Sequence, residues 1–288
     1  MVLDEPITVM VDANGYVQAL RAGSKAKPKL EPLRTFDTST AQHLVVITSS
    51  GQLHRALGTA VPTDKPTAAV NVFAGLDPAD KVLGWWVDSS FPTDLLLVTS
   101  DGQVKRIEGD DLAGGDRKGG ISLVKVASGA RVVHVFEFHG DRPVLIVTRN
   151  GQAVRFVPDD VRPMGRSAAG VRGIKLTPGD EVVGAVHPAA DDHRLLVVQG
   201  KGGARRVAIS EFPVQGRASK GVKCAQVTPK SGSVVAVIGT TDADSVTVRD
   251  ADGNVSVVSS GAFALSARDA AGAKVRNFAG TITAFEQV

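Results

Sequence analysis

The sequence contains only one cysteine, Cys224, among its 288 residues. A single cysteine excludes an internal disulfide framework and any zinc site made of several cysteines, and it fits a reducing compartment. No apolar run approaches the roughly 18 residues that a membrane-spanning helix needs. The first six residues lack the basic start and the long apolar stretch of a signal peptide. These absences lead us to expect a cytoplasmic protein without a membrane partner.

Aromatic residues are also scarce, at 5% of the chain, with one tyrosine and two tryptophans. Proteins that bind single-stranded nucleic acid stack bases on aromatic side chains, and Tyr16, Trp85 and Trp86 are too few for that role. Catalytic signatures such as H-E-x-x-H, the P-loop and G-x-S-x-G do not occur. We therefore expect no catalytic centre and no metal site, and we expect Cys224 to be a small buried residue.

Glycine is abundant, with 31 residues, and some of these glycines recur at a fixed spacing. An apolar run ends in a polar turn and a glycine, as in Leu44-Val-Val-Ile-Thr-Ser-Ser-Gly51 and Val144-Leu-Ile-Val-Thr-Arg-Asn-Gly151. Asn-Gly and Asp-Gly between such runs predict β-hairpins with type I′ turns, in which both central residues have positive φ. The hairpin glycines are Gly15, Gly51, Gly102, Gly151, Gly202 and Gly253, and they lie 36, 51, 49, 51 and 51 residues apart.

A second glycine marker keeps the same period. Gly120, Gly170, Gly221 and Gly272 lie 50, 51 and 51 residues apart, and each is followed by an apolar residue. The periodicity of an amphipathic helix is hardly visible. A period of about 50 residues with several strands per unit is typical of a propeller-like array. We therefore predict one all-β domain over residues 1–288, built from six repeats of antiparallel strands.

The net charge of +3 hides an uneven distribution. Residues 162–223 contain eleven Lys and Arg against five Asp and Glu, which gives +6, whereas the rest of the chain sums to −3. Cations recur just after the hairpin glycine in four consecutive repeats, and radial symmetry would place them side by side on one outer rim. These candidates are Arg55, Lys105, Arg106, Arg155, Arg205 and Arg206.

Further cations flank the second glycine marker. Glycine lets a backbone approach a phosphate closely, and a neighbouring Arg or Lys neutralises its charge. A basic stripe with few aromatics and no recognition helix indicates sequence-nonspecific binding to the backbone of double-stranded DNA, with bending. The candidates in this group are Arg117, Lys118, Arg166, Arg172, Arg217, Lys220 and Lys223.

Two segments resemble a known family. Val161-Arg-Pro-Met-Gly-Arg-Ser-Ala-Ala-Gly-Val-Arg-Gly-Ile-Lys175 and Glu211-Phe-Pro-Val-Gln-Gly-Arg-Ala-Ser-Lys-Gly-Val-Lys223 are similar to the C-terminal domain of the type IIA topoisomerase A subunit, the family of DNA gyrase A and its topoisomerase IV counterpart. The resemblance implies a six-bladed β-pinwheel whose blades exchange strands and whose basic outer rim binds and bends DNA. It implies, as partners, the ATPase B subunit together with the rest of the A subunit, and it implies a nucleoid-associated location. ATP and Mg would be bound elsewhere in the holoenzyme, with no cofactor in this domain.

The resemblance breaks down at one point. Gyrases carry a box similar to Gln-Arg-Arg-Gly-Gly-Lys-Gly in the first blade, which they need to wrap DNA. The corresponding stretch here, residues 21–30, has lysines but no Gly-Gly core. The segment most similar to the box is Asp116-Arg-Lys-Gly-Gly120, which lies in the third repeat. This favours a topoisomerase IV-like or divergent gyrase A paralogue. Tyr16 has no neighbouring arginine, so the family's catalytic tyrosine is not expected in this chain.

A different class of function stays open from the sequence alone. A propeller can also serve as a protein-interaction or glycan-binding module without wrapping DNA. The two classes differ in where the important residues lie. DNA binding needs Arg and Lys on the outer rim, whereas a glycan site needs carboxylates or aromatics on the central face.

Overall fold

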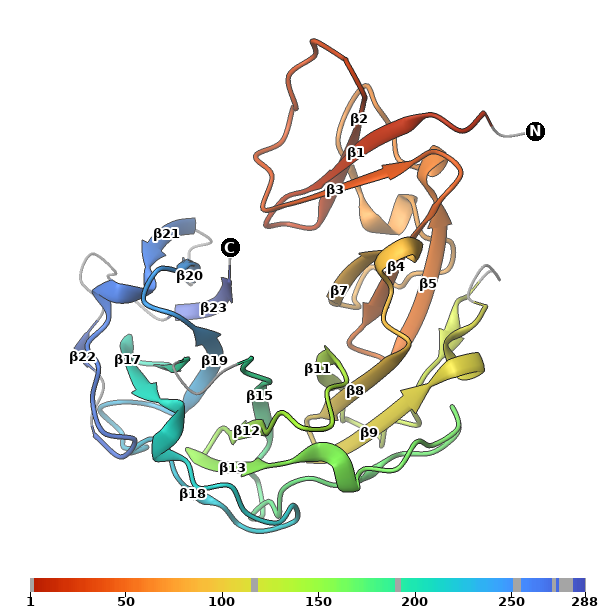
Figure 1. The fold of residues 1–288 in the computed structure, drawn as a ribbon. Coiled ribbons are helices and arrows are strands. Elements are labelled where there is room, and N and C mark those ends of the chain that lie inside the picture. The colour runs from red at the N-terminus through yellow and green to blue at the C-terminus, as the bar shows by residue number, and fades with distance from the viewer. Residues whose placement is uncertain are drawn as a thin grey trace. The chain divides into compact units, whose positions relative to one another are not determined.

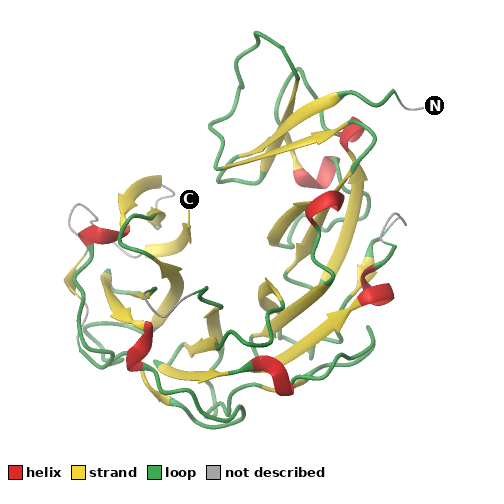
Figure 2. Cartoon of the chain, in the orientation of Figure 1, coloured by secondary structure: helices red, strands yellow, loops and turns green. Residues whose placement is uncertain are grey.

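The computed structural model shows a fold of antiparallel β-strands joined by loops and short 3-10 turns (Figures 1 and 2). Its described residues are 3–114, 119–189, 193–250, 255–270, 273–274 and 282–287. Within these ranges there is no α-helix, and no helix is long and apolar enough to cross a membrane. Short 3-10 turns occur at η1 (Gly58–Ala60), η2 (Ala69–Asn71), η3 (Asp88–Ser90), η4 (Gly109–Leu112), η5 (Pro158–Asp160), η6 (Ile209–Glu211) and η7 (Ser260–Ala262).

Every sheet contains a hairpin close to a position that the glycine repeat predicts, although Gly253, the glycine predicted for the last one, lies outside the described residues. The two hairpin strands are antiparallel neighbours, and most apolar residues of the first five hairpins are buried. The hairpins are β1 (Pro6–Val11) with β2 (Tyr16–Arg21), β4 (His43–Thr48) with β5 (Gln52–Leu57), β8 (Asp94–Thr99) with β9 (Gln103–Glu108), β12 (Val144–Thr148) with β13 (Gln152–Phe156), β16 (Arg194–Gln199) with β17 (Gly203–Ala208), and β20 (Ser245–Asp250) with β21 (Val255–Ser259).

The predicted turn type was wrong. The N–H of Gly51 donates to the carbonyl of Thr48 at 2.9 Å, and Gly151 does the same to Thr148 at 2.9 Å. Both glycines have a φ of 77°, but none of the residues between has positive φ. This is a type I turn followed by a glycine in the left-handed region, which adds a one-residue bulge to the hairpin. Glycine is still required, but at one position only.

A third strand from the same repeat lies beside the first hairpin strand, on the side away from the second, and gives a three-stranded antiparallel sheet. These third strands are β3 (Arg34–Ser39), β7 (Val82–Val87), β11 (Val132–Glu137), β15 (Val182–Val186), β19 (Val234–Thr240) and β23 (Ile282–Gln287).

A fourth, two-residue strand comes from the following repeat. It pairs with the second hairpin strand of the preceding one, so the sheet orders are β3-β1-β2-β6, β10-β5-β4-β7, β11-β8-β9-β14, β15-β12-β13-β18 and β19-β16-β17-β22, with β21-β20-β23 as the last sheet. The all-β fold and the strand exchange are thus confirmed. The exchanged strands are β6 (Thr67–Ala68), β10 (Ile121–Ser122), β14 (Val171–Arg172), β18 (Val222–Lys223) and β22 (Ala273–Lys274).

The chain separates into two compact units, each made of several segments. Unit 1 is Met1–Leu95, Ile107–Val126 and Pro163–Ala169, and unit 2 is Leu96–Arg106, Ala127–Arg162 and Gly170–Val288. Each unit has its own apolar core, in which Val9, Val46 and Phe73 belong to unit 1 and Leu145, Leu195 and Phe212 to unit 2. The assignment of residues 1–288 to a single domain stays a prediction.

The second glycine marker lies where the exchanged strand meets its host. A Cβ added to Gly170 would lie 2.5 Å from the carbonyl oxygen of Val104, and one added to Gly120 would lie 2.7 Å from that of Leu53. Both glycines also have positive φ, at 102° and 67°. The periodic glycine is therefore required by the contact between repeats, because no side chain fits between the two backbones.

We expect Gly170→Ala to destabilise the fold by at least about 2 kcal/mol more than Gly179→Ala, because it adds a backbone clash to the strain of a positive φ. Gly179 is a matched control, since its φ is 77° and no atom lies within 4 Å of an added Cβ. Urea unfolding of both variants measures the difference, and equal midpoints would contradict the close-approach argument.

Candidate nucleic-acid interface

The cations that follow the hairpin glycines are largely inside the protein. Lys105 and Arg205 are 0% and 1% exposed, and Arg155 and Arg206 are 7% and 8% exposed. The side chain of Arg55 is 11% exposed. The prediction that these residues form a solvent-exposed basic rim is wrong for all five.

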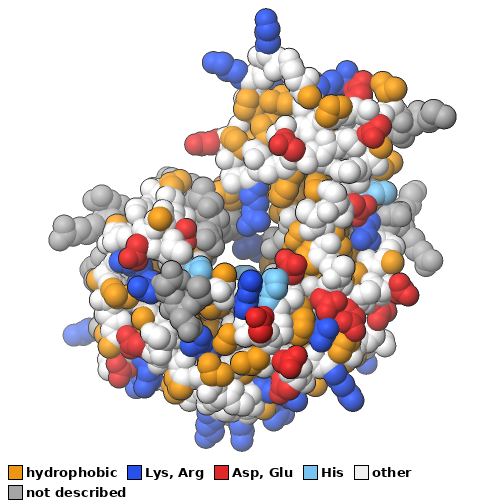
Figure 3. Space-filling model, viewed as in Figure 1, with side chains coloured by type: hydrophobic (Ala, Val, Ile, Leu, Met, Phe, Trp, Pro, Cys, Tyr) orange, Lys and Arg blue, Asp and Glu red, His pale blue; other side chains and the backbone are white. Residues whose placement is uncertain are grey.

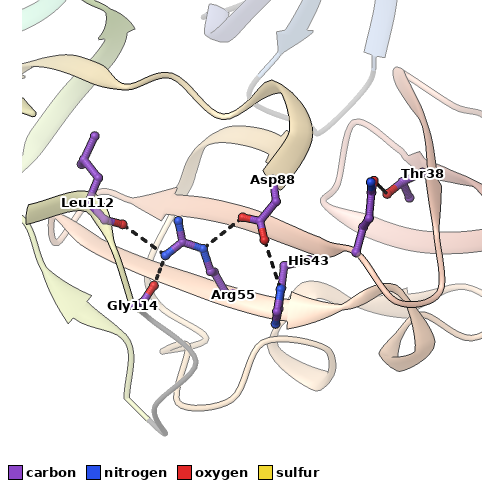
Figure 4. Close-up of polar contacts among 7 residues, drawn as sticks. Thr38, His43, Arg55, Asp88, Leu112 and Gly114 are labelled. Carbon is purple, nitrogen blue, oxygen red and sulfur yellow. Dashed lines mark hydrogen bonds and ion pairs between the residues drawn. The ribbon is translucent and has the colours of Figure 1, made fainter. Parts of the chain in front are cut away.

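Arg55, on β5, shows what holds such an arginine (Figure 4). Its Nε donates to Asp88 at 3.2 Å, and its Nη1 donates to the carbonyl of Leu112 at 3.2 Å and to that of Gly114. Asp88 also lies 3.1 Å from Nδ1 of His43. The guanidinium thus joins a hairpin strand to the 3-10 turn η4 of the next repeat.

Arg155 and Arg206 repeat this arrangement in unit 2. Nη1 of Arg155 donates to the carbonyls of Ile209 and Phe212, each at 3.4 Å. Nε of Arg206 donates to the carbonyl of Phe263 at 2.8 Å, and its Nη1 pairs with Asp242. Leu112, Phe212 and Phe263 each lie 57 residues after their arginine, so one contact recurs in three places.

The residue before each of these arginines lies under the exchanged strand. Nη2 of Arg205 donates to the carbonyls of Arg268, at 2.8 Å, and Cys224. Burial lowers the pKa of Arg205, and its Nε and Nη1 have no hydrogen-bond partner. Lys105 is covered in the same way, with its Cβ only 3.2 Å from where a Cβ of Gly170 would lie.

Arg106 is half-buried for a different reason. Its guanidinium lies over the ring of Phe138, 4.0 Å from the ring centre, which is a cation–π contact. The prediction of an exposed basic rim was wrong because strand periodicity and charge within one repeat do not indicate how the next repeat packs against it. A 3-10 turn and an exchanged strand from that repeat cover the side chains and supply carbonyl oxygens as partners.

The second group of candidates lies differently. Arg117 and Lys118 fall outside the described residues. Arg166 pairs with Asp111 at 3.4 Å, and its side chain is 43% exposed. The remaining four, with Lys175, form a group in unit 2 that we call the exchange-strand cluster, consisting of Arg172, Lys175, Arg217, Lys220 and Lys223.

Backbone hydrogen bonds assemble the exchange-strand cluster from two segments. The N–H of Lys175 donates to the carbonyl of Ser219 at 2.8 Å, and the N–H of Ala218 donates to that of Gly173 at 2.7 Å. Nη1 of Arg217 reaches the carbonyl of Arg172 at 3.4 Å. The two cationic segments 172–175 and 217–223 are thereby fixed side by side.

Four members of the exchange-strand cluster are exposed, namely Arg172, Lys175, Lys220 and Lys223. Arg217 is the fifth, with a side chain 31% exposed and an ion pair to Asp160 at 3.0 Å. Lys and Arg side chains project from the surface over β13 and β18 (Figure 3). This surface can therefore offer several exposed positive charges to an anion.

The backbone at the exchange-strand cluster contains a local outlier. Ala218 has a φ of 64° and is the one non-glycine with positive φ among the described residues. Such a conformation costs energy in an L-residue, and it persists where the surroundings enforce it, often at functional sites. Here it turns the chain between Arg217 and Lys220.

Lys175 was missed as a site residue. It lies three residues after Arg172, and Lys125 occupies the same place 50 residues earlier and is also exposed. The repeat period could have identified it, because a lysine lies at the same distance after the second glycine marker in both repeats.

The two tryptophans pack against other aromatic rings, and Cys224 is a small buried residue, as the sequence predicted for the cysteine. Trp85 packs edge-on against Phe73 at 5.7 Å between ring centres, and Trp86 does so against Phe91 at 5.6 Å. Cys224 is 0% exposed. Among the described residues, no group of three or more His, Cys, Asp or Glu could hold a metal ion.

We expect Arg155→Ala to lower the free energy of unfolding by about 2–3 kcal/mol, because it removes a buried charged donor from two carbonyls. Arg149→Ala should cost under about 1 kcal/mol, since Arg149 is 54% exposed and makes only a surface ion pair with Glu181. Chemical denaturation compares the two variants. A similar loss in both would contradict a positioning role for the buried arginine.

Burial raises the pKa of the Cys224 thiol to about 12. A thiol is nucleophilic only as the thiolate, so at pH 8 the folded protein should react with iodoacetamide far more slowly than the protein in denaturant. Mass spectrometry of the alkylated chain follows the rate. Equal rates in native and denaturing buffer would show that Cys224 is accessible in the folded protein.

Comparisons with known proteins agree with this geometry. The family model "DNA gyrase C-terminal domain, beta-propeller" matches residues 93–138, 142–187 and 200–240. DNA gyrase A of Chlamydia muridarum is 32% identical over 225 residues, which cover 76% of this chain and 27% of that protein. DNA gyrase A of Klebsiella oxytoca is 29% identical, over 85% of this chain and 30% of that protein. The chain thus spans under a third of the length of these relatives.

Solved structures share the fold. The C-terminal domain of a DNA topoisomerase IV superposes with a TM-score of 0.88 at 21% identity, over 100% of this chain and 94% of that one. The C-terminal domain of a DNA gyrase A gives 0.72 at 22% identity, over 98% and 99%. The family model and the gyrase A relatives, together with the exchanged strands, show that the chain belongs to the beta-propeller family of DNA gyrase C-terminal domains.

Proposed function

We propose that this chain binds double-stranded DNA without sequence specificity and bends it. The exchange-strand cluster supports the proposal most directly. It combines five cations on two segments held together by backbone hydrogen bonds, with Asp160 as the carboxylate that an ion pair brings to it. Membership of a family named after DNA gyrase supports the same partner.

The chemistry of the exchange-strand cluster fits phosphate better than base edges. Its members are exposed Lys and Arg on short strands and loops, and the described residues contain no helix that could enter a major groove. Cations of this kind displace counterions from the backbone and read no sequence. The buried arginines are not part of the proposed contact surface.

We propose further that the chain is the DNA-presenting domain of an ATP-dependent type IIA topoisomerase, with residues 1–288 as one module. Its partners would be the ATPase subunit together with the rest of the A subunit, on the nucleoid in the cytoplasm, with cleavage and ATP hydrolysis in those other parts. The loop at residues 21–29 supports a topoisomerase IV-like or divergent gyrase A paralogue, since it is exposed and lysine-rich but lacks a Gly-Gly core.

Replacing Arg172, Lys175, Lys220 and Lys223 together by Ala should weaken duplex binding strongly and flatten its salt dependence. Each lost phosphate contact removes about 0.9 from the slope of log K against log[salt], so four contacts change it by about 3.6. Fluorescence anisotropy with a linear duplex at several salt concentrations measures both quantities.

The matched control replaces Lys65, Lys81, Lys201 and Lys230, four exposed lysines outside the exchange-strand cluster. It removes the same net charge, so it should leave the slope nearly unchanged. Equal effects of the two quadruple variants would reject the cluster as the site. Failure of the unmodified chain to bind duplex DNA would reject the proposed function and favour an interaction module.

A further inference from the structure

Two exposed apolar side chains occupy the same place in consecutive repeats. Val214 is 51% exposed and Leu265 is 55% exposed. Each lies three residues before an arginine, Arg217 and Arg268 respectively, in the segment between a 3-10 turn and an exchanged strand. An isolated exposed valine needs no explanation, but repetition at one structural position does.

The buried arginines hold these apolar residues in place. Val214 forms a parallel bridge with Arg155, and Leu265 forms one with Arg206. The N–H of Gln215 donates to the carbonyl of Arg155 at 2.8 Å, and that of Ser266 to the carbonyl of Arg206 at 3.0 Å.

The arginine side chains fix the other end of the same segments. The guanidinium of Arg155 binds the carbonyl of Phe212, two residues before Val214, and that of Arg206 binds the carbonyl of Phe263, two residues before Leu265. Each apolar side chain is therefore projected from a backbone fixed on both sides. Little conformational entropy is lost when such a residue is buried by a partner.

The charge around these residues selects the partner. Arg217, Lys220 and Lys223 follow Val214 along the chain, and Nη1 of Arg268 donates to the carbonyl of Lys223 at 2.7 Å, which brings the Leu265 segment to the same surface. Protein–protein interfaces are depleted of Lys at their centre. An apolar side chain flanked by cations instead suits duplex DNA, whose deoxyribose walls are apolar and whose phosphates flank them.

We infer that Val214 and Leu265 pack against the minor-groove walls of the duplex that the exchange-strand cluster binds. The inference rests on the proposed function and adds a second kind of contact to it. Apolar side chains placed in a minor groove between cations are a known means of stabilising bent DNA. Their contribution comes from surface removed from water, so it does not depend on salt as phosphate contacts do.

The test is a double variant that combines Val214→Ser and Leu265→Ser in one chain. Its binding is compared with that of the unmodified chain. We expect duplex affinity to fall about tenfold at every salt concentration, with the slope of log K against log[salt] unchanged. Anisotropy with a linear duplex over a salt series measures both, and thermal unfolding confirms that the double variant is folded.

Val257→Ser is the matched control, because Val257 is 64% exposed but lies on β21, outside the segments that precede the exchanged strands. It should bind DNA as the unmodified chain does. Unchanged affinity in the double variant, or a loss that Val257→Ser reproduces, would overturn the inference while leaving the proposed function intact. A loss that disappears at high salt would also overturn it, since it would be electrostatic. If the unmodified chain did not bind, the proposed function itself would fail.

Discussion

The contact on which the rest of the structure depends is the passage of a glycine over the backbone of the neighbouring repeat. Gly170 lies against the carbonyl of Val104 with no room for a side chain, and Gly120 lies in the same way against Leu53. This approach lets a two-residue strand complete the sheet of the preceding repeat. Because each host sheet gains its fourth strand from the next repeat, sheet completion couples neighbouring repeats.

The same exchange determines which cations face solvent. A hairpin strand would expose Arg155 or Arg206 if its repeat stood alone, but the following 3-10 turn covers the guanidinium and offers carbonyl oxygens to it. Arg172 and Lys223, by contrast, are the second residues of exchanged strands and remain exposed. The exchanged strand that completes the sheet of the preceding repeat thus also bears an exposed basic side chain. Structural and proposed binding roles are divided between two sets of basic residues that look alike in the sequence.

The division of the basic residues into a buried and an exposed set explains which features the sequence predicts and which it does not. Apolar runs and glycines with a period near 51 residues predict the hairpins, because strand alternation and left-handed turns leave a local signal. The burial of Lys105 and Arg205 leaves no such signal, since it depends on a segment of another repeat. Charge alone is typical of a surface, so the pattern indicated an exposed rim. Lys175 could have been predicted as a site residue from the repeat period, because Lys125 occupies the same position one repeat earlier.

The excess of positive charge in residues 162–223 therefore has two physical meanings. Arg205 and Arg206 contribute to the sum but lie inside, bonded to carbonyl oxygens, where they fix the backbone. Their proposed effect on DNA is indirect, because both bind carbonyls of the segment that carries Arg268 and the exposed Leu265. A buried arginine in one repeat thus sets the geometry of the surface in the next. For this reason the regularity of the exposed surface follows from contacts in the interior, and not from the number of charges.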